Sequence, residues 1–152
     1  MANYSAVGTR TASATLSILS LTGAASNPRR AKIYDFIFGS SATPGDFAFL
    51  LQAQRCTTAG TAGSAVTPQT LDPADTIAST MVGGQAHSAD PTLTSNQIPI
   101  SIALNQRATF RWVAAPGGEI VTPATASNGI AFRTTTAGAL VTVDVTCHFA
   151  EQ

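Results

Sequence analysis

The sequence predicts an all-β fold: an antiparallel β-sandwich of jelly-roll type with about eight strands, long loops and at most one short helix. Apolar side chains alternate with polar or small ones in segments 98–104 and 141–149, which is the period-2 pattern of strands that bury one face. Turn-forming residues recur between such segments about every ten residues, as in sandwiches and barrels. The 152 residues fit a single domain, 1–152.

The N-terminal part predicts an arm and three strands. Residues 1–12 are a candidate N-terminal arm. The apolar stretch 16–21 follows Arg10, as in a signal peptide, but serines interrupt it, so we expect a strand of a protein made in the cytosol. Residues 32–38 and 47–56 are rich in apolar and aromatic side chains, and a turn at 43–46 separates them. We expect these two runs to pair as a hairpin.

The middle of the chain, residues 57–97, predicts a long loop region, because Thr, Ala, Gly, Ser and Pro dominate it. Asp72 provides an N-cap, Pro73 suits a first helical turn, and Asp75 complements the helix dipole. Residues 73–80 are therefore the one candidate helix. Long loops in a compact domain usually serve function or assembly.

The C-terminal part predicts further strands separated by turns. Residues 108–114 alternate in character, and turns are expected at Pro116-Gly117-Gly118, at Asn128-Gly129 as type I′, and at Ala137-Gly138. In the last strand the odd-numbered residues 141–149 share one face and the even-numbered residues 142–148 share the other.

The charge content is low for a soluble domain, and positive and negative residues are equal in number. Charged residues make up 11% of the chain, against about 25% in an average soluble protein. Eight basic and eight acidic residues give a formal net charge of +0, which excludes a protein that coats polyanions and predicts no nucleic-acid partner. No apolar run approaches the roughly 18–20 residues that span a bilayer, so no membrane partner is expected. Because so weakly charged a surface favours association over solubility, we expect that other proteins cover it.

The two cysteines, Cys56 and Cys147, lie far apart in the sequence. One pair leaves both a single disulfide and two free thiols open, because disulfide-stapled secreted domains usually carry more cysteines. We expect free, buried thiols.

The sequence carries no P-loop, no GxGxxG, no GxSxG and no HExxH motif. His87, Ser88 and Asp90 are neighbours along the chain, but a catalytic triad needs convergence in space, so we expect a solvated loop histidine. Asp144 and His148 share a strand face about 13 Å apart, too far to ligate one metal ion alone.

The acidic residues also give no site. Asp72, Asp75 and Asp90 could form a calcium-type cluster, yet capping and turn roles account for Asp72 and Asp90, and no EF-hand spacing supports such a cluster. We therefore assign no catalytic, cofactor-binding or metal-ligating residue, expect no cofactor, and expect no enzyme. Binding residues are left unassigned.

Seven of the eight basic residues are arginine, with Lys32 as the single lysine. Arginine is enriched at protein interfaces, where lysine is depleted. A GC-rich genome, which raises Ala, Gly and Arg together, explains the same bias equally well. The arginines on or beside predicted strands are Arg29, Arg30, Arg107, Arg111 and Arg133.

Two blocks of sequence resemble a group of small structural proteins of tailed bacteriophages. The first block is residues 30–44, RAKIYDFIFGSSATP, continued by QRCTTAGT at 54–61, and the second is IALNQRATFRWVAAPGGE at 102–119. With Asp72-Pro73-Ala74-Asp75 between them, they cover most of residues 29–135, and they contain no catalytic signature.

The resemblance implies a virion component, above all a head decoration or cement protein. Such proteins commonly bind the major capsid protein on the outer surface of the head as homotrimers. The implied location is the capsid exterior, after synthesis in the bacterial host cytoplasm. The major capsid subunit itself, a tail or baseplate protein, and a glycan-binding host-adsorption module are the alternatives.

Overall fold

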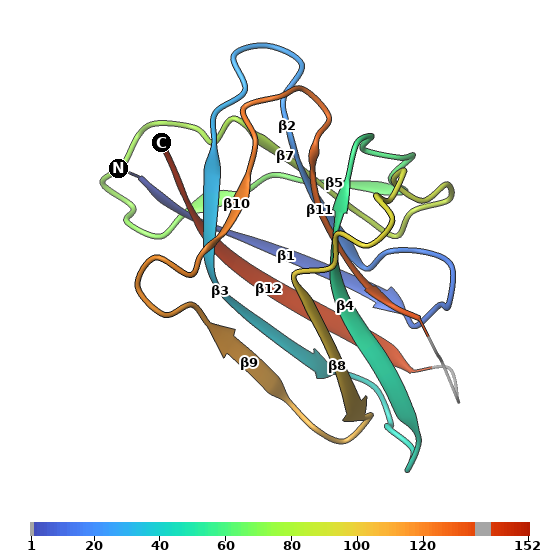
Figure 1. Ribbon diagram of the computed structural model, residues 1–152. Coiled ribbons are helices and arrows are strands. Elements are labelled where there is room, and N and C mark those ends of the chain that lie inside the picture. Colours follow the sequence, from blue (N-terminus) through green and yellow to red (C-terminus); the bar gives the residue numbers. More distant parts are fainter. Residues whose placement is uncertain (1, 136–140) are drawn as a thin grey trace.

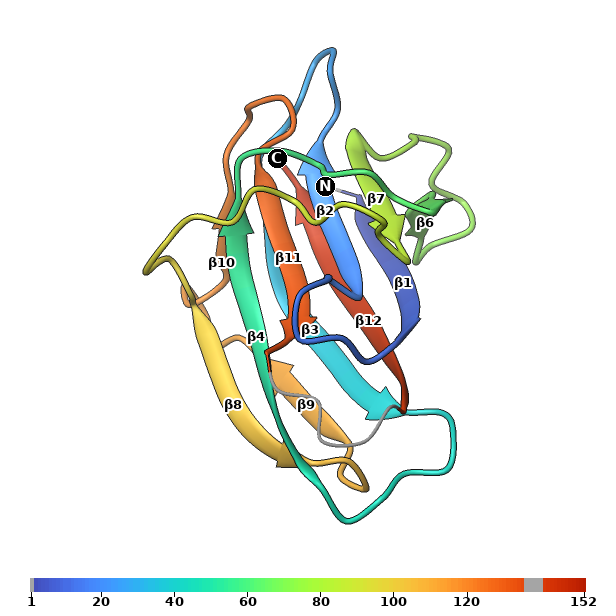
Figure 2. The same cartoon turned by 90° about the vertical axis from the view of Figure 1, so that its right-hand side faces the viewer.

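The computed structural model describes residues 2–135 and 141–152, and within them it contains twelve strands and no helix (Figure 1). The all-β prediction is therefore confirmed. The strands form two antiparallel sheets that face each other. Figure 2, turned by a quarter, shows the two sheets as separate layers, with β4, β11 and β2 in one and β3, β12 and β1 in the other.

Each sheet has six strands. Sheet A has the order β10-β3-β12-β1-β6, with β9 also paired to β3, and its strands are β1 (Asn3–Thr11), β3 (Ala31–Ser40), β6 (Gln69–Thr70), β9 (Phe110–Val113), β10 (Ile120–Thr122) and β12 (Thr142–Glu151). Sheet B has the order β5-β7-β2-β11-β4-β8, and its strands are β2 (Leu19–Gly23), β4 (Ala48–Cys56), β5 (Ser64–Val66), β7 (Met81–Gln85), β8 (Ile100–Asn105) and β11 (Gly129–Thr134).

One hydrophobic core fills the space between the sheets. Phe36 of β3 packs on Phe132 of β11 with ring centroids 5.1 Å apart, and Phe38 meets Phe49 of β4 edge to face at 5.3 Å. These four rings are buried and join sheet A to sheet B. The predicted alternation in β12 is confirmed, since its odd-numbered residues 143–149 are buried and its even-numbered residues 142–148 are half-buried. In β8, Ile100, Ile102 and Leu104 pack against the core, as their period predicts.

Two expectations for the N-terminal half are wrong. Residues 3–11 do not form an arm: they form β1, which lies between β12 and β6 inside sheet A. Segments 32–38 and 47–56 do not form a hairpin, because β3 belongs to sheet A and β4 to sheet B. The connection between them crosses from one layer to the other, and both strands carry aromatic residues because both face the same core.

The 57–97 segment contains β5, β6 and β7, so it is less irregular than its composition predicts. The candidate helix over 73–80 is absent: the backbone N–H of Asp75 donates to the Asp72 carbonyl in a single turn, and no helix follows. The Asp72 carboxylate caps that turn, accepting from the Ala74 N–H at 2.9 Å. Glu151 of β12 holds the next residues instead, accepting from the backbone N–H groups of Thr80 and Met81 at 2.8 and 3.2 Å.

The turns agree with the sequence in part. Gly118 N–H donates to the Ala115 carbonyl at 2.8 Å, and Gly117 has φ +81°, as a Pro-Gly type II turn requires. The type I′ assignment at Asn128-Gly129 is wrong, because Ser127 takes the positive φ and Gly129 already belongs to β11. The turn expected at Ala137-Gly138 lies outside the described residues.

Candidate interaction surfaces

His87 is buried, with 1% of its surface exposed, and this corrects the expectation of a solvated loop histidine. Its Nε2 lies 3.0 Å from the hydroxyl oxygen of Ser20, which β2 carries on the outer face of sheet B. Burial lowers the pKa of His87, so the neutral ring is favoured. Ser88, its neighbour in sequence, bonds instead to the carbonyl of Thr61 at 3.4 Å. The sequence gives no local signal for Ser20, whose partner is 67 residues away.

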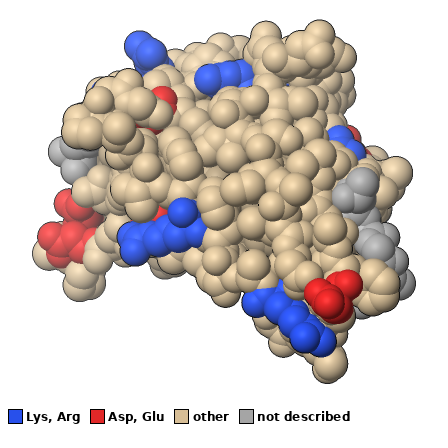
Figure 3. Space-filling view, turned by 60° about the horizontal axis from the view of Figure 1, so that its bottom comes forward, with Lys and Arg blue, Asp and Glu red and all other residues tan. Residues whose placement is uncertain are grey.

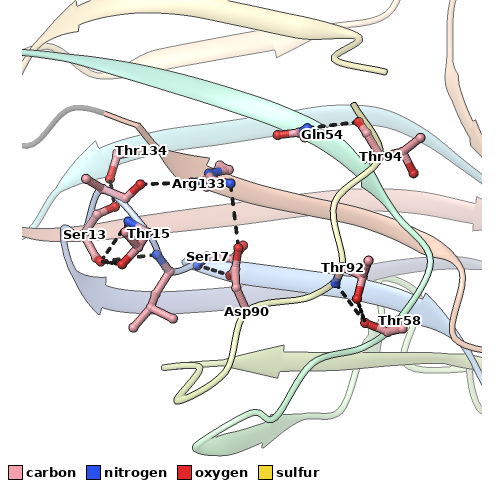
Figure 4. A network of polar contacts seen from close by, with 12 residues as sticks. Ser13, Thr15, Ser17, Gln54, Thr58, Asp90, Thr92, Thr94, Arg133 and Thr134 are labelled. Carbon is pink, nitrogen blue, oxygen red and sulfur yellow. Dashed lines mark hydrogen bonds and ion pairs between the residues drawn. The ribbon is translucent and has the colours of Figure 1, made fainter. Parts of the chain in front are cut away.

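Asp90 fastens the loops that cover sheet B to the strands beneath them (Figure 4). Its Oδ1 accepts from the backbone N–H of Ser17 at 2.6 Å, and its Oδ2 lies 3.8 Å from Nη1 of Arg133 on β11. Arg133 also donates through Nη2 to the carbonyl of Ala14 at 2.9 Å. The segments around residues 13–17 and 87–92 therefore act as straps over β2 and β11.

The Ser20–His87 pair lacks what a nucleophilic serine needs. Such a serine requires a third group that orients the histidine and open access for a substrate. Ser20 is 1% exposed, and the Asp90 carboxylate is engaged by Ser17 and Arg133 rather than by the imidazole. The geometry fits a structural role for these three side chains, which hold the straps on the sheet.

The other acidic candidates stay apart. Asp72 caps its turn, and Asp90 binds the straps. Over residues 2–135 and 141–152, no three His, Cys, Asp or Glu side chains gather as ligands for one metal ion. Asp144 and His148 lie on one face of β12, and His148 is bonded to an aspartate of the neighbouring strand.

That aspartate is Asp35, the centre of a charged cluster on the outer face of sheet A. Its Oδ1 and Oδ2 accept from Nε and Nη2 of Arg111 at 3.0 and 2.8 Å, and Oδ2 also lies 3.1 Å from Nδ1 of His148. Asp35 is 4% exposed. The hydrogen bonds from Arg111, helped by His148, hold the pKa of Asp35 below its usual value in spite of burial.

A β-bulge places Asp35 on this outer face. The register of β3 against β12 pairs Asp35 with His148 but Ile33 with Phe149, so Tyr34 is an extra residue in β3. Strict alternation from Ile33 would turn Asp35 toward the core, and for this reason the sequence pattern does not reveal it. The ring of Tyr34 then lies 6.4 Å from that of His148.

Two arginines occupy inner-face positions at the ends of strands. Arg10 follows Tyr4, Ala6 and Gly8 at the next inner position of β1, and its Nη1 donates to the carbonyls of Ser17 and His87 at 3.3 and 3.0 Å. The sequence pattern did not predict this inner position of Arg10, nor that of the second arginine described next.

The second is Arg55, which follows Phe49, Leu51 and Ala53 on the inner face of β4. Its Nη1 reaches across to the carbonyl of Val121 on β10 of sheet A at 2.6 Å. Here the two layers part into an open groove of about 480 Å³, the Arg30–Arg55 groove, lined by Arg30, Arg55, Gln97, Val121, Pro123 and Ala124.

The arginines expected at an interface have different surroundings. Arg111 and Arg133 form ion pairs on the outer faces of sheets A and B. Arg107 lies in the turn between β8 and β9, where its backbone N–H donates to the Asn105 side chain at 2.9 Å. Arg29 and Arg30 precede β3 and are exposed.

Both cysteines are free and buried, as expected. Burial raises the pKa of Cys56 to about 12 and raises that of Cys147 as well, so neither thiol ionises near neutral pH.

Most of the surface seen in Figure 3 is uncharged, with basic and acidic side chains confined to a few small groups. No helix that could cross a membrane occurs in the described part of the chain. Comparisons of the chain with protein-family models, with curated proteins and with solved structures found no match. What the protein does is therefore inferred from its own residues.

Proposed function

We propose that the protein is a non-enzymatic bacteriophage capsid decoration protein, which binds and clamps major capsid proteins on the outer surface of the head. The observation that carries the proposal is the resemblance of residues 30–44 with 54–61, and of residues 102–119, to small phage structural proteins. These blocks lie far apart in sequence, yet they meet in sheet A, where β3 of the first block pairs with β9 of the second.

The finer fold we propose is a jelly roll. Leaving out β5, β6 and β7 of the 57–97 segment and the three-residue β10, which pairs with β3 as β9 does, the remaining order is β1-β12-β3-β9 in one sheet and β2-β11-β4-β8 in the other. Along the chain, these eight strands change sheet at every step except from β4 to β8, which both belong to sheet B. Two Greek keys folded together as a jelly roll produce this order. Jelly rolls recur in viral capsid domains and in lectins, so the fold is compatible with the proposal without deciding it.

The mechanism we propose is multivalent clamping by a homotrimer. Each subunit of a decoration protein buries only a modest area, and linking three subunits raises the effective concentration of the second and third contacts. The broad uncharged surface in Figure 3 suits contacts with other proteins, since charged residues are depleted at the centres of interfaces.

Purified virions test this proposal directly. Mass spectrometry of mature heads should find the protein at hundreds of copies, and cryo-EM should place it as trimers on the outer shell. Light scattering of the isolated protein should give three times the 15.5 kDa mass of the chain. Absence from mature heads would refute the proposal, and six or twelve copies per virion would move the protein to the tail or baseplate.

A glycan-binding module is the second candidate, and one observation favours it. The outer face of sheet A presents the half-buried ring of Tyr34 beside the Arg111–Asp35–His148 cluster. Aromatic rings next to fixed polar groups are the usual composition of small polar binding sites. Binding to a glycan array that is lost in the Tyr34→Ala variant would support this candidate. Absence of binding to any glycan on the array would refute it.

A further inference from the structure

We propose that the Arg30–Arg55 groove binds a carboxylate group presented by an acidic segment of a protein partner. The inference rests on the proposed function only for the identity of that partner. The chemistry of the groove stands on its own residues.

The position of Arg55 is the first observation. Inner-face positions of β4 carry Phe49, Leu51 and Ala53, each at most 1% exposed. The next inner position carries a guanidinium at the mouth of the core, directly opposite the buried Ile130 of β11. Arg55 is half-buried there, so its guanidinium has lost part of its hydration. In return it makes one hydrogen bond, to the carbonyl of Val121.

The absence of a counterion is the second observation. Among the described residues, Arg111 and Arg133 each form an ion pair with an aspartate, whereas neither Arg30 nor Arg55 pairs with any carboxylate. The six lining residues include two arginines and no acid. A partly desolvated positive charge gains most from an arriving anion, because the surrounding dielectric is lower than that of water.

The shape of the groove indicates the class of anion. A guanidinium presents its N–H donors in a planar fork that matches a carboxylate, and one arm of the Arg55 fork is already fixed by the Val121 carbonyl. Val121, Pro123 and Ala124 add apolar walls, and Gln97 adds an amide. A volume of about 480 Å³ is larger than a bare inorganic anion needs and accommodates the aliphatic stem of a glutamate with its flanking backbone.

The location suits a partner protein. The groove is open to solvent between β10 of sheet A and the end of β4 of sheet B, so an extended acidic segment can enter without any rearrangement of the core. Because the chain has no net charge, a groove of this sign gives it a local field that selects acidic surfaces.

The test is an NMR titration of the folded protein with three probes: the peptide acetyl-Gly-Glu-Gly-amide, its Gln counterpart, and inorganic phosphate. The Glu peptide should shift the side-chain signals of Gln97 and Arg55, with an affinity that falls severalfold when salt rises from about 20 to 200 mM. Arg30→Gln should weaken binding about threefold or more and Arg55→Gln should remove it, whereas Arg107→Gln, an equal charge change in the distant β8–β9 turn, should leave it unchanged.

Equal shifts with the Gln peptide, or equal weakening by Arg107→Gln, would overturn the assignment. Binding of phosphate without the Glu peptide would overturn the acidic-segment assignment as well. Because Arg55→Gln removes the tie to Val121 and could unfold the end of the groove, Arg30→Gln is the decisive variant: its exposed side chain makes no side-chain hydrogen bond within the described residues. If the protein is found on phage heads but the groove does not bind the Glu peptide, only this inference is refuted. If the groove binds the Glu peptide but the protein is absent from heads, only the capsid proposal is refuted.

Discussion

Replacement of Asp35 by asparagine tests whether the cluster on the outer face of sheet A stabilises the fold through its charge. Asp35→Asn keeps the size of the side chain and removes the negative charge that Arg111 and His148 share. The carboxylate is almost fully buried and accepts three hydrogen bonds, at 3.0, 2.8 and 3.1 Å. Hydrogen bonds to a charged group of this kind contribute more than neutral ones.

The size of the effect is limited by solvent. The Arg111 side chain is 61% exposed, so water and salt screen its attraction to Asp35. We therefore expect Asp35→Asn to lower the free energy of unfolding at pH 7 by about 1–3 kcal/mol, because a neutral amide accepts weaker hydrogen bonds than the carboxylate and places its own N–H donors beside those of Arg111 and His148. Urea denaturation followed by tryptophan fluorescence measures this loss, since Trp112 packs on the neighbouring Phe36.

The pH dependence of the loss is the sharper measurement. Because the pKa of Asp35 is lowered in the folded protein, its stabilisation is fully present above the unfolded value of about 4 and disappears as the pH falls through the folded pKa. The difference between wild type and Asp35→Asn should accordingly shrink as the pH falls below about 4 and through the lowered pKa of Asp35. Other carboxylates titrate equally in both proteins and cancel from this difference.

Asp144→Asn is the matched control, because it makes the same chemical change on the outer face of the same sheet, at a carboxylate that forms no hydrogen bond or ion pair among the described residues. It should change the free energy of unfolding by no more than about 0.5 kcal/mol at either pH. A loss for Asp35→Asn that does not diminish as the pH is lowered from 7 through the acid range would refute the electrostatic reasoning and leave only a packing effect.

Three further predictions follow from the core and its edges. Phe132→Ala should cost about 3–5 kcal/mol in urea denaturation, whereas Phe47→Ala, at a side chain 49% exposed, should cost far less; equal losses would contradict the two-layer core. Gly129→Ala should cost about 3 kcal/mol or more or prevent soluble expression, because the new Cβ would lie 1.9 Å from a backbone oxygen of β2, while Gly117→Ala meets open space and should cost about 1 kcal/mol. Both thiols should react with a disulfide reagent at pH 8 only after denaturant is added, since burial raises their pKa, and fast labelling of the native protein would show that they are accessible.

The sequence predicted the class of the fold because burial on one face leaves a period of two, and β8 and β12 show it clearly. It did not predict which strands pair. β3 and β4 are consecutive and similar in composition, yet they belong to different sheets, and no local pattern distinguishes a hairpin from a crossing between layers. The candidate helix over 73–80 failed because its capping signals also suit a single turn, and Glu151, 71 residues away from Thr80, captures the backbone groups that a helix would have used.

The candidate surfaces were harder to predict because their residues are brought together by long-range pairing. Asp35 contacts Arg111 and His148 from 76 and 113 residues away, and a bulge reverses the face that alternation assigns to it. Arg55 was hidden for a different reason. Its inner-face position is visible only once the register of β4 is known, and a pattern of alternating apolar residues gives no reason to extend the core face to a charged side chain.

The place of β12 in sheet A sets the order in which the protein can fold. This strand, residues Thr142–Glu151, lies between β1 and β3, so the first and the third strand of the chain have no partner for their shared edge until the last ten-residue strand arrives. Until β12 is in place, the edges of β1 and β3 that it covers stay unpaired. We therefore expect slow folding, because these pairings join residues far apart in the sequence, and complete loss of the fold when β12 is deleted.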